Sequence, residues 1–187
     1  MDSAHQTKGI DFIGMVKALR AWRRANPGQG VPGLMPEDMD FLDNTLILSI
    51  DWYPHDRFLR FLDATAALVF GGTREGMLEM GRVAARALYT TVHSSLIYKG
   101  APLHTLRGGI NFIKTHFNFG EWIFLEESKT RAQIKIIGYP EMNEAHGTLL
   151  IGWCEVMIQL SGGAMSEAKI LKAPWRGDEE YLLDMAW

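Results

Sequence analysis

The sequence predicts an α+β fold, with N-terminal helices packed on a four-stranded antiparallel sheet made of two hairpins separated by a buried helix. Three observations carry this prediction: helical periodicity before residue 118, two late pairs of strand-like segments, and an almost wholly apolar segment at 142–161 between those pairs. Helices grouped early and strands grouped late are typical of a sheet covered by helices. The 187 residues are within the usual size of one domain, so we expect a single domain over 1–187.

Five helices are expected before the first strand. In the first of them, Ile10, Ile13 and Val16 recur at helical spacing, and Pro27 with Gly28 opposes any continuation. The second helix begins with a proline in its first turn, a position that proline favours. The expected helices cover 10–25, a segment that begins at 35–37, 55–70 after a turn at 51–54, 73–98, and 101–117 with a kink at Gly108-Gly109.

The expected helix 73–98 has two contrasting faces. One face carries small side chains, which allow another helix to cross closely. A glycine inside a helix costs about 1 kcal/mol relative to alanine, and close packing at Gly81 is the expected compensation. The opposite face is charged, with favourable spacings between acidic and basic side chains. The close-packing face holds Met77, Gly81, Ala84, Ala85 and Leu88, and the charged face holds Glu75, Glu79, Arg82 and Arg86.

The period of the pattern changes after residue 121. Ala132, Ile134 and Ile136 alternate with polar residues, which predicts a strand with one buried face. The segment 122–125 is apolar on both faces and forms the preceding strand of a hairpin. The segment 142–161 is helical and apolar almost all round, so it is expected to be buried on most sides. Two further strands, 166–173 and 179–187, are joined by a turn at 174–178.

Composition excludes several classes of function. The formal charge of −3 gives no electrostatic reason to expect nucleic acid. The short basic stretch of Arg20, Arg23 and Arg24 is expected to be the solvated face of a helix. No run is long enough to span a bilayer, and the start of the chain has no signal-like apolar stretch. The single cysteine, Cys154, suits a reducing compartment, so a cytoplasmic location is expected.

No arrangement of catalytic or metal-binding residues is recognisable, so no enzyme, catalytic residue or metal is expected. None of the six histidines pairs with another ligand at a zinc-like spacing. A haem needs only one axial histidine and is not excluded by spacing; His93 and His116 are the best placed, although ordinary hydrogen-bonded histidines are expected. Cys154 is expected to be a buried structural thiol with its pKa raised by the neighbouring Glu155.

Several short segments carry a resemblance to a known family. They resemble a paralogous family of uncharacterised proteins best known from myxobacteria, over about residues 8–187. That family in turn looks related to the 4-vinyl-reductase domain, the haem nitric-oxide-binding domain and the TRAPP vesicle-tethering subunits. The segments are Asp51-Trp52-Tyr53-Pro54, Phe58, Leu62-Asp63, Phe70-Gly71-Gly72, Gly81-Arg82-Val83-Ala84, Gly138-Tyr139-Pro140, Gly152-Trp153 and Asp184-Met185-Ala186-Trp187.

The resemblance implies a small α+β module, 4-vinyl-reductase-like or TRAPP-like, that binds an apolar ligand or pairs as a dimer. Relatives often carry cysteines in the last strands, and 167–187 has none. A cysteine-bound metal is therefore not carried over. No histidine matches a haem ligand, so haem is not carried over either, and the cofactor stays unknown.

The expected function is a non-catalytic regulatory or sensory domain that binds a small apolar ligand in its core. The ligand would lie between the helices and the sheet, the natural cavity of such a module. The alternative is that the side chains named below simply fill this space, as interiors are close-packed. A homodimeric interaction or scaffold module with a protein partner is the second hypothesis, and a reductase is the third. The candidate ligand-binding residues are Phe112, His116, Trp122, Phe124, Trp153 and Met157.

Overall fold

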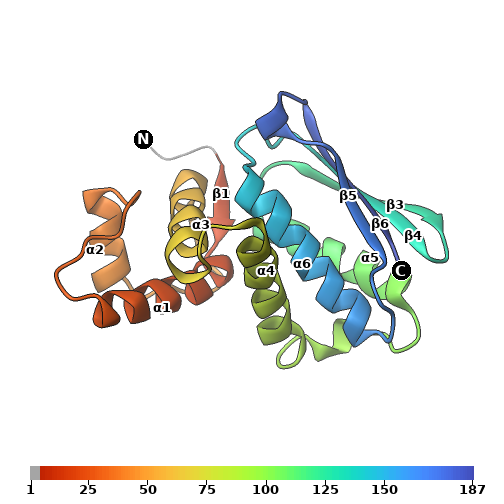
Figure 1. Ribbon diagram of the computed structural model, residues 1–187, viewed down its shortest axis with the longest axis horizontal. Coiled ribbons are helices and arrows are strands. Elements are labelled where there is room, and N and C mark those ends of the chain that lie inside the picture. Colours follow the sequence, from red (N-terminus) through yellow and green to blue (C-terminus); the bar gives the residue numbers. More distant parts are fainter. Residues whose placement is uncertain (1–4) are drawn as a thin grey trace. The chain divides into compact units, whose positions relative to one another are not determined.

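The computed structural model describes residues 5–187, which divide into two compact units (Figure 1). The N-terminal unit comprises the described residues up to Gly76 together with His116–Asn118. The C-terminal unit comprises Met77–Thr115 and Phe119–Trp187. No helix in the described part of the chain has both the length and the apolar character needed to cross a membrane. The single domain over 1–187 stays a prediction.

The N-terminal unit is built around a cluster of aromatic rings. Phe12 of α1 lies at the centre, with ring centroids 5.5–5.9 Å from those of Phe41, Tyr53, Phe58 and Phe61. Aromatic pairs at these distances add to the stabilisation from burial. The helices of this unit are α1 (Ile10–Ala25), α2 (Pro36–Asn44) and α3 (His55–Val69), and its strands are β1 (Gln6–Lys8) and β2 (Trp52–Pro54).

The two short strands correct one expectation. The segment 51–54, expected to be a turn, contains β2, which pairs antiparallel with β1 so that Thr7 faces Tyr53. Strands of three residues are too short to show alternation in the sequence. Thr7 is itself buried, and its hydroxyl is 2.6 Å from Nδ1 of His55, the first residue of α3.

A buried carboxylate ties α2 to α3. Asp38 is fully buried, and its oxygens accept hydrogen bonds from Nε of Arg57 at 2.9 Å and Nε of Arg60 at 2.5 Å. It also caps α2 by accepting from the backbone N–H of Met35 at 3.1 Å. Burial alone would raise the pKa of Asp38, but the hydrogen bonds from Arg60, Met35 and Arg57 outweigh it and lower the pKa.

The C-terminal unit contains the predicted four-stranded antiparallel sheet. Its strands are β3 (Glu121–Ser128), β4 (Arg131–Ile137), β5 (Glu167–Lys172) and β6 (Glu180–Ala186), in the order β3-β4-β6-β5. The two hairpins flank α6 (Glu144–Leu160) in sequence, as predicted. The fold class predicted from the sequence, α+β with helices on an antiparallel sheet, is confirmed.

Three longer helices belong wholly or mainly to the C-terminal unit: α4 (Arg74–Tyr89), α5 (Pro102–Ile113) and α6. The helix expected at 73–98 ends at Tyr89, so that prediction was too long. The helix expected at 101–117 ends at Ile113, followed by a 3₁₀ turn at Lys114–His116, and Gly108-Gly109 continues the helix without a break. In α6, 12 of the 17 residues are buried, which confirms the helix predicted to be enclosed on most sides.

Helices α4 and α6 cross at a pair of glycines. A Cβ at Gly81 would lie 2.0 Å from the carbonyl oxygen of Leu149, and a Cβ at Gly152 would lie 2.0 Å from that of Leu78. The backbones are therefore in direct contact, which only glycine allows at both positions. The helix predicted to cross α4 at Gly81 is thus α6.

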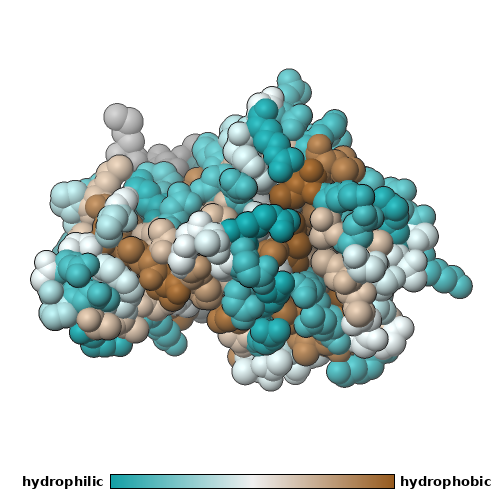
Figure 2. Space-filling model, viewed as in Figure 1, coloured by the Kyte–Doolittle hydropathy of each residue, from teal (hydrophilic) through white to brown (hydrophobic). Residues whose placement is uncertain are grey.

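The charged face of α4 is also present. Figure 2 shows α4 presenting hydrophilic side chains on the visible face of the molecule, and Glu79 there lies within 3.3 Å of Arg82 and 3.6 Å of Arg86. Arg82 in addition reaches α6, where its Nε donates to Glu155 at 2.8 Å. The charged face therefore reinforces the α4–α6 crossing beside the glycines.

Candidate functional site

Trp153 lies where three helices of the C-terminal unit meet. Its side chain, on α6, is 3% exposed, and its ring centroid is 5.4 Å from that of Tyr89 at the end of α4. Its indole also lies against Gly109 of α5. We call this place, formed by Tyr89, Gly109, Trp153 and Met157, the three-helix junction.

Gly109 sets the spacing of the three-helix junction. A Cβ at this position would lie 2.6 Å from Cη2 of Trp153 and 2.6 Å from Cε of Met157. The absence of a side chain therefore makes room for both residues, and α5 continues through Gly108-Gly109 without a break. Met157 is fully buried and has a flexible thioether that adapts to irregular space. Trp153 and Met157, two of the predicted ligand-binding residues, are thus brought together.

The sheet side of the predicted site is covered by α5. Trp122 and Phe124 of β3 share the inner face of the sheet with Ile134 and Ile136, their cross-strand partners on β4. Trp122 is buried and Phe124 is half-buried. The Arg107 guanidinium of α5 lies 5.6 Å from the Phe124 ring centroid and pairs with Glu126 on β3. These contacts fix α5 against β3.

The remaining two candidates lie at the end of α5. Phe112 is half-buried, and its ring packs on that of His93 with centroids 4.4 Å apart. His116 belongs to the N-terminal unit, where its Nδ1 is 3.1 Å from Oδ1 of Asp11. A shared ligand space for all six predicted residues stays a prediction.

The sequence did not single out His146, a histidine whose pKa is strongly lowered by burial. It lies in the first turn of α6, is 3% exposed, and its Nδ1 is 2.7 Å from the Tyr139 hydroxyl. Burial lowers its pKa to about 4, so the ring is neutral near pH 7. The only sequence signal was its place three residues after the N-cap Asn143, whose side chain accepts from the His146 N–H. Because His146 and Tyr139 are both buried, the pair is enclosed rather than open to a substrate.

Cys154 is a structural thiol, as expected, but for a different reason. It is fully buried, and this burial raises the pKa of the thiol. Glu155, expected to raise that pKa, instead forms the ion pair with Arg82. A buried thiol with a raised pKa stays protonated near neutral pH, which fits a structural role.

The arrangement does not fit a metal or a haem at the predicted site. Among residues 5–187, no three or more His, Cys, Asp or Glu side chains are grouped as a metal ion would require. A haem needs a slot for a flat macrocycle, yet α5 and α6 leave less than one methyl group of space at Gly109. Beside the first turn of α6, a Cβ at Gly147 would lie 2.2 Å from the Trp175 ring. At both glycines, protein side chains occupy the adjacent space.

Comparison with known proteins finds likeness at the level of structure. No protein-family model matches the sequence, and no curated protein sequence matches it. The chain is similar to the Fe(II) unliganded H-NOX protein from K. algicida, with a TM-score of 0.65, 11% identity, and coverage of 96% of this chain and 95% of that one. It is also similar to F78L Tt H-NOX (TM-score 0.61, 12% identity, 96% and 94% covered) and to a structure that probes haem distortion in the H-NOX family (TM-score 0.62, 12% identity, 96% and 94% covered).

At these identities the likeness shows the fold alone. It extends over almost all of both chains, so the described elements follow an H-NOX-like course from the first helices to the last hairpin. This agrees with one branch of the resemblance found in the sequence, the haem nitric-oxide-binding domain.

Proposed function

We propose that this chain is a non-catalytic regulatory or sensory domain that binds a small apolar ligand at the three-helix junction, with the Trp153 indole as one wall of the site. The observation that carries the proposal is the H-NOX-like fold over 96% of the chain. The names of those structures mention Fe(II), haem distortion and H-NOX activation. A regulatory role, which the word activation describes for those proteins, is what the present chain is proposed to share, and haem is the part that its packing does not support.

The chemistry of the junction supports an apolar ligand. The Trp153 indole offers an aromatic wall to a ligand, and Met157 beside it adapts to different shapes. Tyr89 adds a second aromatic wall. No acid, base and nucleophile come together here, because Cys154 is a buried thiol with a raised pKa and the His146–Tyr139 pair is enclosed. These contacts support a binding role over a catalytic one.

The resemblance to the myxobacterial family, and through it to the 4-vinyl-reductase and TRAPP-like modules, forms part of the same proposal. So does a single domain over 1–187, in which both units act together. Native mass spectrometry of the freshly purified chain tests the proposal directly. We expect a co-purifying small molecule, or saturable binding of 1-aminoanthracene as an apolar probe. The absence of both a bound mass and a saturable probe signal would contradict the proposal.

Substitution of Trp153 locates the ligand. If the indole is only core, Trp153→Ala lowers the free energy of unfolding by about 3–5 kcal/mol. At a ligand site the loss is smaller without ligand, because the pocket already tolerates an empty state, and stabilisation by 1-aminoanthracene disappears. Trp153→Phe is the matched control that keeps an aromatic ring. A large loss of stability with the probe response unchanged would refute this placement.

A homodimeric interaction module is the alternative proposal, and exposed apolar residues favour it. Val83 on α4 is 47% exposed and Val92 just beyond it is 82% exposed. Helix α6 contributes no large exposed apolar side chain among the described residues. Light scattering measures the molar mass in solution and so distinguishes the two proposals. A monomer at high protein concentration excludes the homodimer and leaves the ligand-binding proposal intact.

A further inference from the structure

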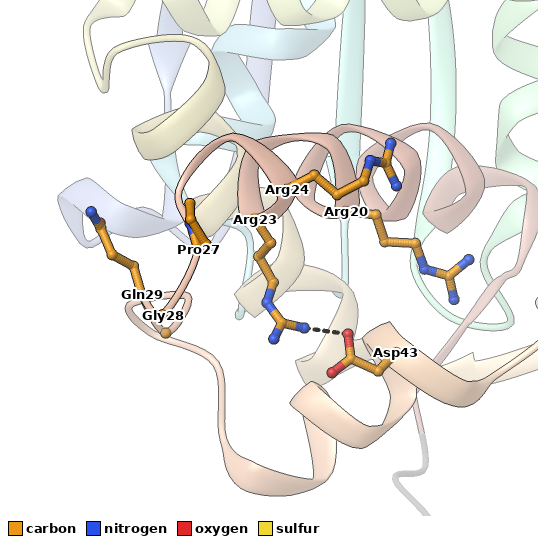
Figure 3. A pocket seen from close by; sticks show the side chains of 8 residues that line it. Arg20, Arg23, Arg24, Pro27, Gly28, Gln29 and Asp43 are labelled. Carbon is orange, nitrogen blue, oxygen red and sulfur yellow. Dashed lines mark hydrogen bonds and ion pairs between the residues drawn. The ribbon is translucent and has the colours of Figure 1, made fainter.

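We propose that a pocket at the end of α1, in the N-terminal unit, binds the phosphate group of a small phosphorylated ligand. The pocket has a volume of about 520 Å³ (Figure 3). Its lining combines three guanidinium groups, one carboxylate and a glycine-rich loop, and includes Arg20, Arg23, Arg24, Gly28, Gln29 and Asp43. This site is separate from the three-helix junction and does not depend on the function proposed there.

Two hydrogen bonds to backbone carbonyl groups fix the Arg20 guanidinium in one orientation. Its Nε donates to the carbonyl oxygen of Leu42 at 2.6 Å, and its Nη2 donates to that of Thr45 at 3.2 Å. Both acceptors are backbone groups at the end of α2 and just beyond it, so they fix the orientation of the guanidinium. No described residue accepts a hydrogen bond from its Nη1. Figure 3 shows Arg20 and Arg23 reaching toward the side of α1 on which Asp43 lies.

Arg23 is held by a carboxylate that a ligand can replace. It pairs with Asp43, and the two side chains are 32% and 43% exposed. Exposed ion pairs of this kind contribute at most about 1 kcal/mol. A doubly charged phosphate offers more acceptor oxygens than one carboxylate and matches the forked geometry of arginine. Asp43 therefore holds Arg23 in position and competes with the ligand for it.

Arg24 supplies the mobile part of the site. It is exposed, and within the described residues no ion pair restrains it. In Figure 3 its guanidinium is turned away from Asp43, so it would swing toward a bound anion. The loop opposite leaves space for this, because a Cβ at Gly28 or Gly30 would meet nothing within 4 Å.

The balance of charge favours an anion of this size. The carbonyl end of α1 contributes about half a negative charge, which is small beside three guanidinium groups. The positive lining contrasts with the net charge of −3 for the whole chain. The volume exceeds that of a bare phosphate, so the organic part of the ligand would lie over the glycine-rich loop.

Calorimetric titration of the full chain with glycerol 3-phosphate tests the site. We expect saturable binding that weakens with added salt. Arg24→Gln should lower the affinity roughly tenfold through loss of a charge-assisted hydrogen bond, without affecting the fold. Asp43→Asn should raise it, because the competing carboxylate is removed. Lys17→Gln, which removes the same charge from an exposed position on α1 outside the pocket, should leave it unchanged.

A parallel titration with phosphatidylcholine vesicles, with and without phosphatidic acid, identifies the source of the phosphate. Binding to glycerol 3-phosphate alone points to a soluble metabolite. Binding confined to vesicles with phosphatidic acid, and lost in Arg24→Gln, points to a lipid headgroup in the same site. No binding in either titration overturns the proposal. Equal losses in Arg24→Gln and Lys17→Gln also overturn it, because they would show general attraction to a basic helix.

Discussion

The buried His146 makes stability depend on pH in a defined window. Burial holds its pKa at about 4, against about 6.5 in an unfolded chain. Between these values the unfolded chain binds a proton that the folded chain does not, so stability is complete above about pH 6.5 and falls as the pH drops toward 4. We expect the free energy of unfolding to fall by about 2 kcal/mol from pH 7 to pH 5 on this account, as measured by urea unfolding.

His146→Gln provides the control for this pH dependence. Glutamine can still bond the Tyr139 hydroxyl but cannot be protonated, so the decrease between pH 7 and pH 5 should largely vanish. If the variant loses as much stability as the natural chain over that range, another group is responsible.

Asp38 is the second buried ionisable residue with a measurable consequence. Asp38→Asn leaves Arg57 and Arg60 without their carboxylate, and we expect a loss of about 2–3 kcal/mol near pH 7. Because the pKa of Asp38 is lowered in the fold, its contribution is present above the unfolded value near 4 and is lost only as the pH falls below it. Asp40→Asn, at an exposed position of α2, should change stability little. Equal effects of the two substitutions would contradict the role given to Asp38.

At the level of elements, the α4–α6 crossing is the contact least tolerant of added volume. Gly81→Ala places a methyl carbon 2.0 Å from the Leu149 carbonyl oxygen, so the helices must separate. We expect a loss of about 3 kcal/mol. Gly14→Ala in α1 is the matched control, because nothing lies within 4 Å of its added carbon. That change should stabilise the chain by about 0.5–1 kcal/mol, and both values come from thermal or urea unfolding. Unchanged stability in Gly81→Ala would show that the crossing is looser than described.

Helices and strands were predictable where apolar residues recur at a regular spacing over many residues. α1, α3, α6 and the strands β4, β5 and β6 follow the expected segments closely, whereas β3, expected over 122–125, runs from Glu121 to Ser128. The end of α4 was missed because apolar residues continue beyond it, although Thr90 and Thr91 mark it. Their hydroxyls bond the carbonyls of Arg86 and Ala87 in the last helical turns. Gly108-Gly109 was taken for a kink because its packing role against Trp153 depends on a distant segment.

For the molecule as a whole, the likeness to H-NOX structures and the packing at Gly109 lead to opposite expectations about haem. We expect the chain purified from cells supplied with a haem precursor to show no Soret absorption band, because Trp153 and Met157 of α6 fill the space beside Gly109 of α5 in the predicted ligand site. Haem titration into the purified chain is the second measurement. A stoichiometric Soret band in either experiment would contradict the closed packing described for this unit.

The residues of a site can be predicted from the sequence when they lie close together along the chain, and not when the fold brings distant segments together. Trp153 and Met157 were identified because they lie on an almost wholly apolar helix that was expected to pack against the sheet. The pairing of His146 with Tyr139 depends on how the chain enters α6. The arginine pocket depends on α2 returning beside α1, which brings Asp43 to Arg23. No local pattern in the sequence predicts either of these two contacts.

The strand order has a consequence during synthesis. Strand β4 pairs with β3 at once, but its other edge pairs with β6, so that Ile134 faces Leu183. A nascent chain therefore carries a hairpin in which the second edge of β4 has no partner until α6, β5 and β6 have left the ribosome. Exposed edges of this kind invite pairing with other chains. Protection of this intermediate by a chaperone, rather than the final stability of the fold, would then set the yield of folded protein in the cell.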